Sequence, residues 1–240
     1  MELGALQIGV LFGVVLLGAA LQGAVGFGLG MLAAPVISII APQLLPGFVI
    51  LLAVVLTASA ALIERTSIDV RGAGWALVGR IPGSVGGTLL VAWLSDDALT
   101  IFVVVTVLLG VGISLRGWAP AATPSNVAIA GVVSGAMGTA TGIGGPPMAL
   151  VWQGSEPATY RATMSAYFLI GTLISLVMLI GAGQVSRETV IWSVYAVPVV
   201  LLGWGVSRIA ARRIDQHAVR LGAVILSVVG ALIALGSVIA

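Results

Sequence analysis

Two clusters of glycine followed by proline are the residues of this chain that most clearly could form a binding site. The first is LQGAVGFGLGMLAAP (residues 21–35), and the second is GTATGIGGPPMALVW (residues 138–152). Glycine and proline disfavour a helix interior, so each cluster predicts a helix break. A helix that restarts after a break exposes unpaired N–H groups and about +0.5 charge at its N-terminus. Such helix ends are typical of anion-binding sites.

The second cluster predicts a helix that ends near Gly138, an unwound link, and a half-helix that starts at Pro146. We expect two helix N-termini, near Gly30 and Pro146, to face one central point. Close packing of helices through small residues is the alternative role of the glycines. The candidate substrate-binding residues are Gly26, Gly28, Gly30, Arg80, Thr139, Thr141, Gly142, Gly144, Gly145 and Pro146.

Arg80, in WALVGRIPG, falls inside the apolar segment 73–94. Ionisable residues within a membrane segment are usually functional, so we expect Arg80 to face a cavity. The alternative is a side chain that reaches the membrane interface along its apolar stem. The carboxylates lie at segment edges or in loops, which argues against a cation substrate. Gln22 and Gln153 flank the two breaks, and we expect both to be interfacial residues without a role.

The composition indicates a polytopic membrane protein. Of 240 residues, 60% are hydrophobic and only 8% are charged, whereas soluble domains carry about 25% charged residues. Absence of cysteine excludes disulfides and thiolate chemistry, and no cluster of metal ligands is visible. The ten basic residues are all arginine, and in a membrane protein they indicate loop charge rather than a nucleic-acid partner. We expect no cofactor.

The apolar segments divide into two similar sets. GFGLGM from Gly26 matches GIGGPP from Gly142 at an offset of 116 residues, and Gly83 matches Gly203 at an offset of 120. We therefore predict an all-α protein with two inverted repeats, 1–120 and 121–240. Each repeat comprises a broken or re-entrant helical hairpin and three transmembrane helices. The segments are 3–21, 29–41, 47–63, 73–94 and 98–115, then 127–137, 147–153, 162–181, 189–207 and 218–239.

The arginines predict the orientation of these repeats. If each broken opening stretch enters the membrane and returns, the loops 64–72, 116–126, 153–161 and 208–217 share one face, which holds most of the arginines. The opposite face holds Asp96, Asp97, Glu188 and only Arg187. Positive charge accumulates on cytoplasmic loops, so we expect both termini outside. The N-terminal stretch carries Glu2 and lacks the positive charge of a signal peptide, so we expect the first helix to be retained.

These motifs resemble the TauE/SafE family of sulfite exporters, also called the 4-toluene sulfonate uptake permease family. The resemblance rests on GFGLG (26–30) with Pro35, on GIGGP (142–146), and on a layout that covers essentially the whole chain. Leu29 and Pro146 depart from the small residue that is common at that position, which bears on substrate size. The resemblance implies a secondary transporter of sulfite, thiosulfate or an organosulfonate such as sulfoacetate, by alternating access, with export as the expected direction.

Other functions remain open on the residues alone. One alternative is a transporter or channel for another small organic anion. An intramembrane enzyme is less favoured, since the lone histidine, His217, has no evident serine partner. A structural subunit would leave the paired breaks unexplained. The expected partners are a small sulfur-containing anion and membrane lipids, with a homodimer left open, in a bacterial plasma membrane. The residues do not choose between import and export, nor do they identify a coupling ion.

Overall fold

The computed structural model describes residues 3–63, 67–115, 120–210 and 216–239, and within these ranges the regular structure is entirely helical. This confirms the all-α prediction. Each predicted apolar segment corresponds to one helix. The helices are α1 (Ala5–Val25), α2 (Leu29–Ile40), the short 3-10 helix η1 (Pro42–Leu44), α3 (Gly47–Ile63), α4 (Val70–Trp93), α5 (Asp96–Leu115), α6 (Pro124–Thr141), α7 (Gly145–Trp152), α8 (Pro157–Gly181), α9 (Arg187–Ala210) and α10 (Gln216–Ile239).

One helix boundary differs from the sequence-based expectation. α6 continues past Gly138 to Thr141, and the link before α7 is only Gly142, Ile143 and Gly144. The residues after Gly138 are threonine and alanine, which a helix accommodates, and the helix ends where Gly142 adopts a left-handed conformation. Pro146 falls in the first turn of α7, where a missing N–H costs little.

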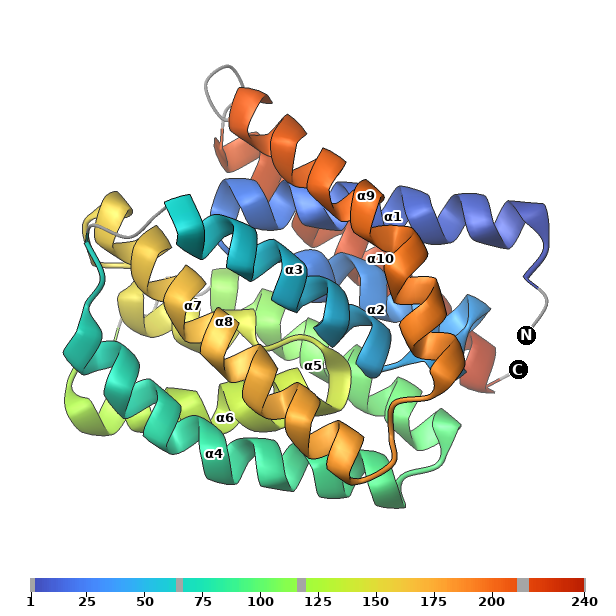
Figure 1. The fold of residues 1–240 in the computed structure, drawn as a ribbon, viewed down its shortest axis with the longest axis horizontal. Helices are drawn as coiled ribbons and strands as arrows, with labels where there is room; N and C mark the ends of the chain where they lie inside the picture. The colour runs from blue at the N-terminus through green and yellow to red at the C-terminus, as the bar shows by residue number, and fades with distance from the viewer. Residues whose placement is uncertain (1–2, 64–66, 116–119, 211–215, 240) are drawn as a thin grey trace.

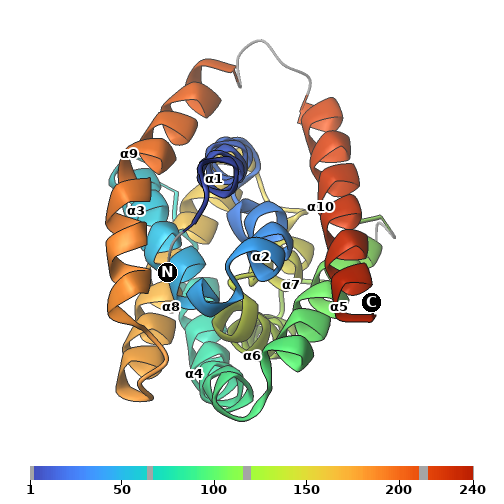
Figure 2. The same ribbon diagram turned by 90° about the vertical axis from the view of Figure 1, so that its right-hand side faces the viewer.

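The short helices α2 and α7 lie near the centre of the molecule, with longer helices around them (Figure 2). Most residues of both helices are buried, which explains why both are apolar on all sides. Among the described residues, four helices are long and apolar enough to cross a membrane. They are α1, α4, α8 and most of α9.

Opposite ends of the molecule carry different connections. In Figure 1, the beginning of α1 and the end of α10 lie at the right, as does the turn between α4 and α5. The connection from α7 to α8 lies at the left, where α4 begins and α9 ends. Arg71, Arg161 and Arg208 belong to these left-hand helix ends, whereas Asp96 and Asp97 begin α5 at the right. Arg65, Arg116, Arg212 and Arg213 fall outside the described residues.

Glycine allows α4 and α6 to pack with their backbones in contact. A Cβ at Gly79 or Gly83 of α4 would collide with a carbonyl oxygen of α6, and one at Gly131 would collide with Ala76 of α4. In a membrane the hydrophobic effect does not drive helices together, so helices associate through close packing, which small residues permit. Part of the glycine content, outside the two glycine clusters, therefore serves close helix packing.

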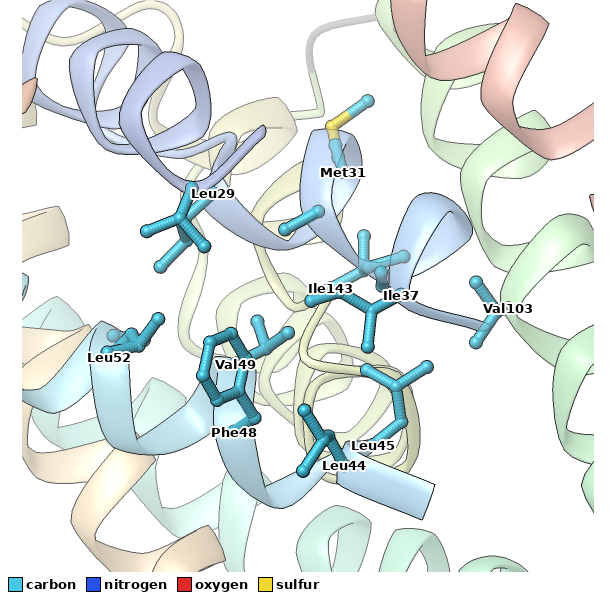
Figure 3. Close-up of a cluster of buried hydrophobic side chains, with 14 of the residues drawn as sticks. Leu29, Met31, Ile37, Leu44, Leu45, Phe48, Val49, Leu52, Val103 and Ile143 are labelled. Atoms are coloured by element: carbon cyan, nitrogen blue, oxygen red, sulfur yellow. The ribbon is translucent and has the colours of Figure 1, made fainter. Parts of the chain in front are cut away.

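Aliphatic side chains fill the space around the two breaks. Figure 3 shows Leu29 and Met31 of α2, Phe48 and Val49 of α3, and Ile143 of the α6–α7 link gathered in one cluster. All five belong to a single group of packed hydrophobic residues that extends to α5, α9 and α10. The chain breaks are thus embedded in protein, which is the condition for irregular backbone at membrane depth.

The α4–α6 contact predicts different outcomes for two nearby alanine substitutions. Gly83→Ala should lower the free energy of unfolding by about 1–3 kcal/mol, because its Cβ would meet the carbonyl oxygen of Val132. Gly86→Ala is the matched control, since no atom lies within 4 Å of its Cβ position, and helix propensity favours alanine by about 0.5–1 kcal/mol. Thermal unfolding of both variants in detergent checks this, and equal melting temperatures would contradict it.

Candidate functional site

The helix ends that precede the two breaks have the same geometry. α1 ends at Gly26 (φ 91°) and α6 ends at Gly142 (φ 77°), both in the left-handed region that favours glycine. The Gly26 N–H donates to the Gln22 carbonyl (2.7 Å), and the Gly142 N–H donates to the Gly138 carbonyl (2.9 Å). The sequence match between Gly26 and Gly142 therefore corresponds to equivalent helix ends.

The breaks lie in contact with each other. A Cβ at Gly30 would collide with the carbonyl oxygen of Gly142, and a Cβ at Gly145 would lie 2.6 Å from the Cβ of Phe27. Gly30 and Gly145 each belong to the first turn of a half-helix. Both half-helices therefore begin at one place in the molecule, as expected from the sequence.

Local side chains satisfy part of the freed backbone. The Leu29 N–H donates to the Gln22 side-chain oxygen (3.1 Å), and the Ile143 N–H donates to Thr141 Oγ1 (3.1 Å). Gln22 is thus not the interfacial residue without a role that the sequence predicts, because its side chain caps α2. Pro146 and Pro147 carry no N–H, so α7 offers fewer backbone donors than α2 in its first turn.

A cavity of about 30 Å³ opens beside the two breaks, which is room for roughly two water molecules. Its walls come from both breaks and from α1, α2, α3, α4, α6, α7 and α8. Among the described residues, its lining includes one charged side chain, Arg80, and no carboxylate. The lining residues are Gln22, Phe27, Gly28, Gly30, Met31, Ile50, Ala53, Thr57, Arg80, Gly138, Gly142, Ile143, Gly144, Gly145, Phe168 and Thr172.

Arg80 is 1% exposed, so its side chain does not reach the molecular surface as the snorkelling alternative requires. Its Nη1 donates to Ser134 Oγ (3.3 Å) and to the Tyr167 hydroxyl (3.2 Å), and its Nη2 donates to Ser175 Oγ (3.2 Å). The guanidinium carbon also lies 5.2 Å from the centre of the Tyr167 ring, a cation–π distance. Its Nε is buried without a hydrogen-bond partner.

Hydrogen bonds connect Arg80 to the second break. Ser134 Oγ, which accepts from Arg80, donates in turn to the Gly144 carbonyl (2.6 Å). Gly171 leaves the space that the guanidinium occupies, since a Cβ there would collide with Arg80 Nε. The position of the charge is therefore set by α6 and α8 together with the link that precedes α7.

The predicted site residues fall into two groups. Six line the cavity, and the other four do not. The six are Gly28, Gly30, Arg80, Gly142, Gly144 and Gly145. Of the rest, Gly26 lines a neighbouring cavity, and Thr139 Oγ1 hydrogen-bonds Ser175 Oγ (2.7 Å), beside Arg80. Thr141 caps its own helix end, and Pro146 packs against Gly110 of α5.

Sequence reasoning missed two cavity-lining threonines. Thr57 of α3 and Thr172 of α8 donate to the carbonyls of Ala53 (2.7 Å) and Phe168 (2.6 Å) respectively. No motif in the sequence marks either residue, and they come together because α3 packs against α8. Their distance in sequence from the glycine clusters hid them.

Tyr167 supports the buried charge, which predicts a cost for removing its hydroxyl. Tyr167→Phe should lower the free energy of unfolding by about 1.5–3 kcal/mol, because a hydrogen bond to a charged group is lost inside the protein. Tyr195→Phe is the matched control, because Tyr195 is 62% exposed. Thermal unfolding of both variants provides the measurement. Equal destabilisation by the two changes would show that the Tyr167 hydroxyl does not stabilise Arg80.

Two comparisons with known proteins match most of the chain. The family model described as sulfite exporter TauE/SafE matches residues 11–234, nearly the whole chain. A curated relative, the probable sulfite/organosulfonate exporter TauE of Cupriavidus necator, is 29% identical over 199 residues, which is 77% of this chain and 77% of that protein. No solved structure matches the chain significantly. With two glycine-rich helix breaks at its centre and a family match across almost all of its length, this chain belongs to the TauE/SafE sulfite exporter family.

Proposed function

We propose that the chain is a secondary transporter that exports a small sulfur-containing oxyanion, and that the Arg80 cavity binds this substrate. The observation that carries the proposal is a buried guanidinium, held by hydroxyl groups, at a cavity between two helix breaks. Family membership supports the substrate class, because the relative from Cupriavidus necator is named a probable sulfite/organosulfonate exporter.

Electrostatics favours an anion in this cavity. Removing a guanidinium from water costs several kcal/mol, which neutral hydroxyls compensate only in part. An anionic substrate would supply the missing charge, and the planar guanidinium suits the paired oxygens of a sulfite or sulfonate group. The N-termini of α2 and α7 add partial positive charge at the same place. Gly28, Gly30 and Gly145 also line the cavity, so a substrate could approach the backbone closely there.

Cavity size favours a small substrate. A volume of about 30 Å³ leaves little room beyond a few atoms, and Phe27 and Phe168 are among its walls. Sulfite matches this size better than an aromatic sulfonate, which would require the helices to separate. We therefore place sulfite and similarly small oxyanions first among the substrates.

The repeat organisation that we propose, residues 1–120 and 121–240, is supported by equivalent contacts. A Cβ at Gly83 would meet the carbonyl of Val132, and a Cβ at Gly203 would meet the carbonyl of Leu16. The offsets between these pairs, 116 and 120 residues, are those of the sequence match. Thus α4 packs on α6 as α9 packs on α1.

A second pair of contacts between the same helices has the same residue offsets, but the glycine and the hydroxyl residue have changed places. Gly87 of α4 lies against Thr139 of α6, whereas Ser207 of α9 lies against Gly23 of α1. At each interface one glycine faces one hydroxyl residue, but the glycine comes from the opposite member of the pair. Such compensation supports a common ancestral interface.

The directions of the helices support an inverted relation. In Figure 1, α4 runs from left to right and α9 from right to left, and the same reversal relates α3 to α8 and α1 to α6. Inverted repeats around a central site allow alternating access, because one repeat can rock against the other. The substrate would then bind between the repeats, where both breaks meet.

Replacing Arg80 tests the site. In calorimetry with purified protein, sulfite and a small sulfonate should bind, and choline should not. Arg80→Ala should weaken sulfite binding by about 2–5 kcal/mol, while Arg80→Lys keeps the charge but loses the planar fork and should weaken it less. Arg71→Ala, which removes an exposed arginine, serves as the control and should leave binding unchanged.

Two results would count against this site. Sulfite binding to the Arg80→Ala protein at the parental affinity would remove Arg80 from the site. Binding of choline without any oxyanion would overturn the anion proposal itself. Flux of sulfite in proteoliposomes, with and without an imposed proton gradient, then separates transport from mere binding and identifies proton coupling.

Orientation in the membrane is tested by single cysteines, for which the chain provides a cysteine-free background. We call the end of the molecule that carries Arg71, Arg161 and Arg208 the arginine-rich end. Because positive charge accumulates on the cytoplasmic side, cysteines at Ser67, Pro124 and Gln216 should be protected from an impermeant thiol reagent in intact cells. A cysteine at Asp97 should react. Labelling at Gln216 without labelling at Ser67 would refute the inverted arrangement.

A further inference from the structure

A second cavity, of similar size, adjoins the Arg80 cavity on the side of the arginine-rich end. It is formed by residues of α1, α3, α8 and α9, which include Gly23, Ala60 and Trp204. Gln22 and Thr57 line both cavities, so one wall is shared. In Figure 1, α9 ends and α8 begins at the left, and this cavity contains residues from both of those ends.

Two arginines from different helices line this second cavity. Arg161 comes from the first turns of α8 and Arg208 from the last turn of α9. The Arg208 guanidinium lies 5.5 Å from the Trp204 ring centre, a stacking contact that holds it near the cavity. No carboxylate belongs to the lining among the residues that the structure describes. Among those residues the lining therefore carries two positive side chains and no negative one.

The shared wall is polar rather than aliphatic. The Gln22 side-chain oxygen accepts the Leu29 N–H, so the other polar group of this amide is its NH2, a donor. Thr57 adds a hydroxyl beside it. An anion that crosses from one cavity to the other would therefore pass the amide NH2 of Gln22 and a hydroxyl oxygen of Thr57 whose own proton is donated to the Ala53 carbonyl, rather than a purely aliphatic barrier.

We propose that the second cavity is an anion-binding vestibule, in which Arg161 and Arg208 concentrate the oxyanion before it passes Gln22 and Thr57 to Arg80. This inference rests on the proposed transport function for the identity of its ligand. The route runs between α1, α3, α8 and α9 and opens at the arginine-rich end. Paired positive charges in a cleft raise the local concentration of anions and their rate of arrival.

A cysteine introduced in place of Ala60 reports the charge of this vestibule directly. In detergent-purified Ala60→Cys protein, we compare the reaction rates of the anionic sulfonatoethyl and the cationic trimethylammonioethyl methanethiosulfonates. Relative to a free thiol, the ratio of anionic to cationic rates should rise about tenfold or more. Adding Arg161→Gln and Arg208→Gln should return the ratio to the free-thiol value, and Arg208→Gln alone should lower it in part.

Two controls make the result specific. Arg71→Gln removes the same charge from the same end of the molecule outside the cavity and should leave the ratio unchanged. Ser95→Cys, beside Asp96 and Asp97 at the opposite end, should prefer the cationic reagent. The proposal is overturned by a free-thiol ratio in the Ala60→Cys protein, by a ratio that survives both arginine changes, or by an equal effect of Arg71→Gln.

Transport provides the second readout. In proteoliposomes, Arg161→Gln with Arg208→Gln should raise the KM for sulfite about tenfold and leave kcat nearly unchanged, because encounter rather than central binding is affected. A lowered kcat with an unchanged KM would count against a vestibule. The two proposals fail separately. An anion preference in the Ala60→Cys protein without sulfite flux would refute the transport function and leave the vestibule. Sulfite flux without the anion preference would refute the vestibule and leave the transport function.

Discussion

A guanidinium buried among hydroxyl groups is the interaction on which the centre of this molecule depends. Arg80 is almost completely removed from solvent, yet its hydrogen-bond partners, Ser134, Tyr167 and Ser175, are all neutral. Hydroxyl groups orient the guanidinium without neutralising it, so its positive charge at the cavity has no anionic partner among them. Glycine at position 171 is equally necessary, because any side chain would occupy the space of the guanidinium.

The breaks could be predicted from sequence because their determinants are local. Gly26 and Gly142 terminate helices through their own backbone conformations, and Pro146 and Pro147 lie in the first turn of α7, where a missing N–H costs little. Sequence reasoning places the end of α6 too early, because Gly138 resembles a residue that ends a helix. In the structure Gly138 lies within α6, and its lack of a side chain lets Gly144 and Arg80 approach closely. Local patterns do not distinguish these two uses of glycine.

The remainder of the candidate site depends on tertiary contacts. Arg80 could be singled out as a charge within an apolar segment, but its hydroxyl partners come from α6 and α8, and nothing near Arg80 in sequence indicates them. Gln22 resembles an ordinary interfacial residue until α2 folds back and presents its N–H groups. Thr57 and Thr172 acquire meaning only when α3 and α8 are placed side by side.

The exchange of side-chain sizes between the two helix interfaces limits how this architecture can be rearranged. Two copies of residues 1–120 would set Gly23 against Gly87 and leave a void, whereas two copies of residues 121–240 would crowd Thr139 against Ser207. The central charge would also change. A dimer of the first half would bury two copies of Arg80, and a dimer of the second half would bury none, because the buried Val200 occupies the corresponding position there. In the repeat organisation proposed above, each half therefore fits the other half and not a second copy of itself.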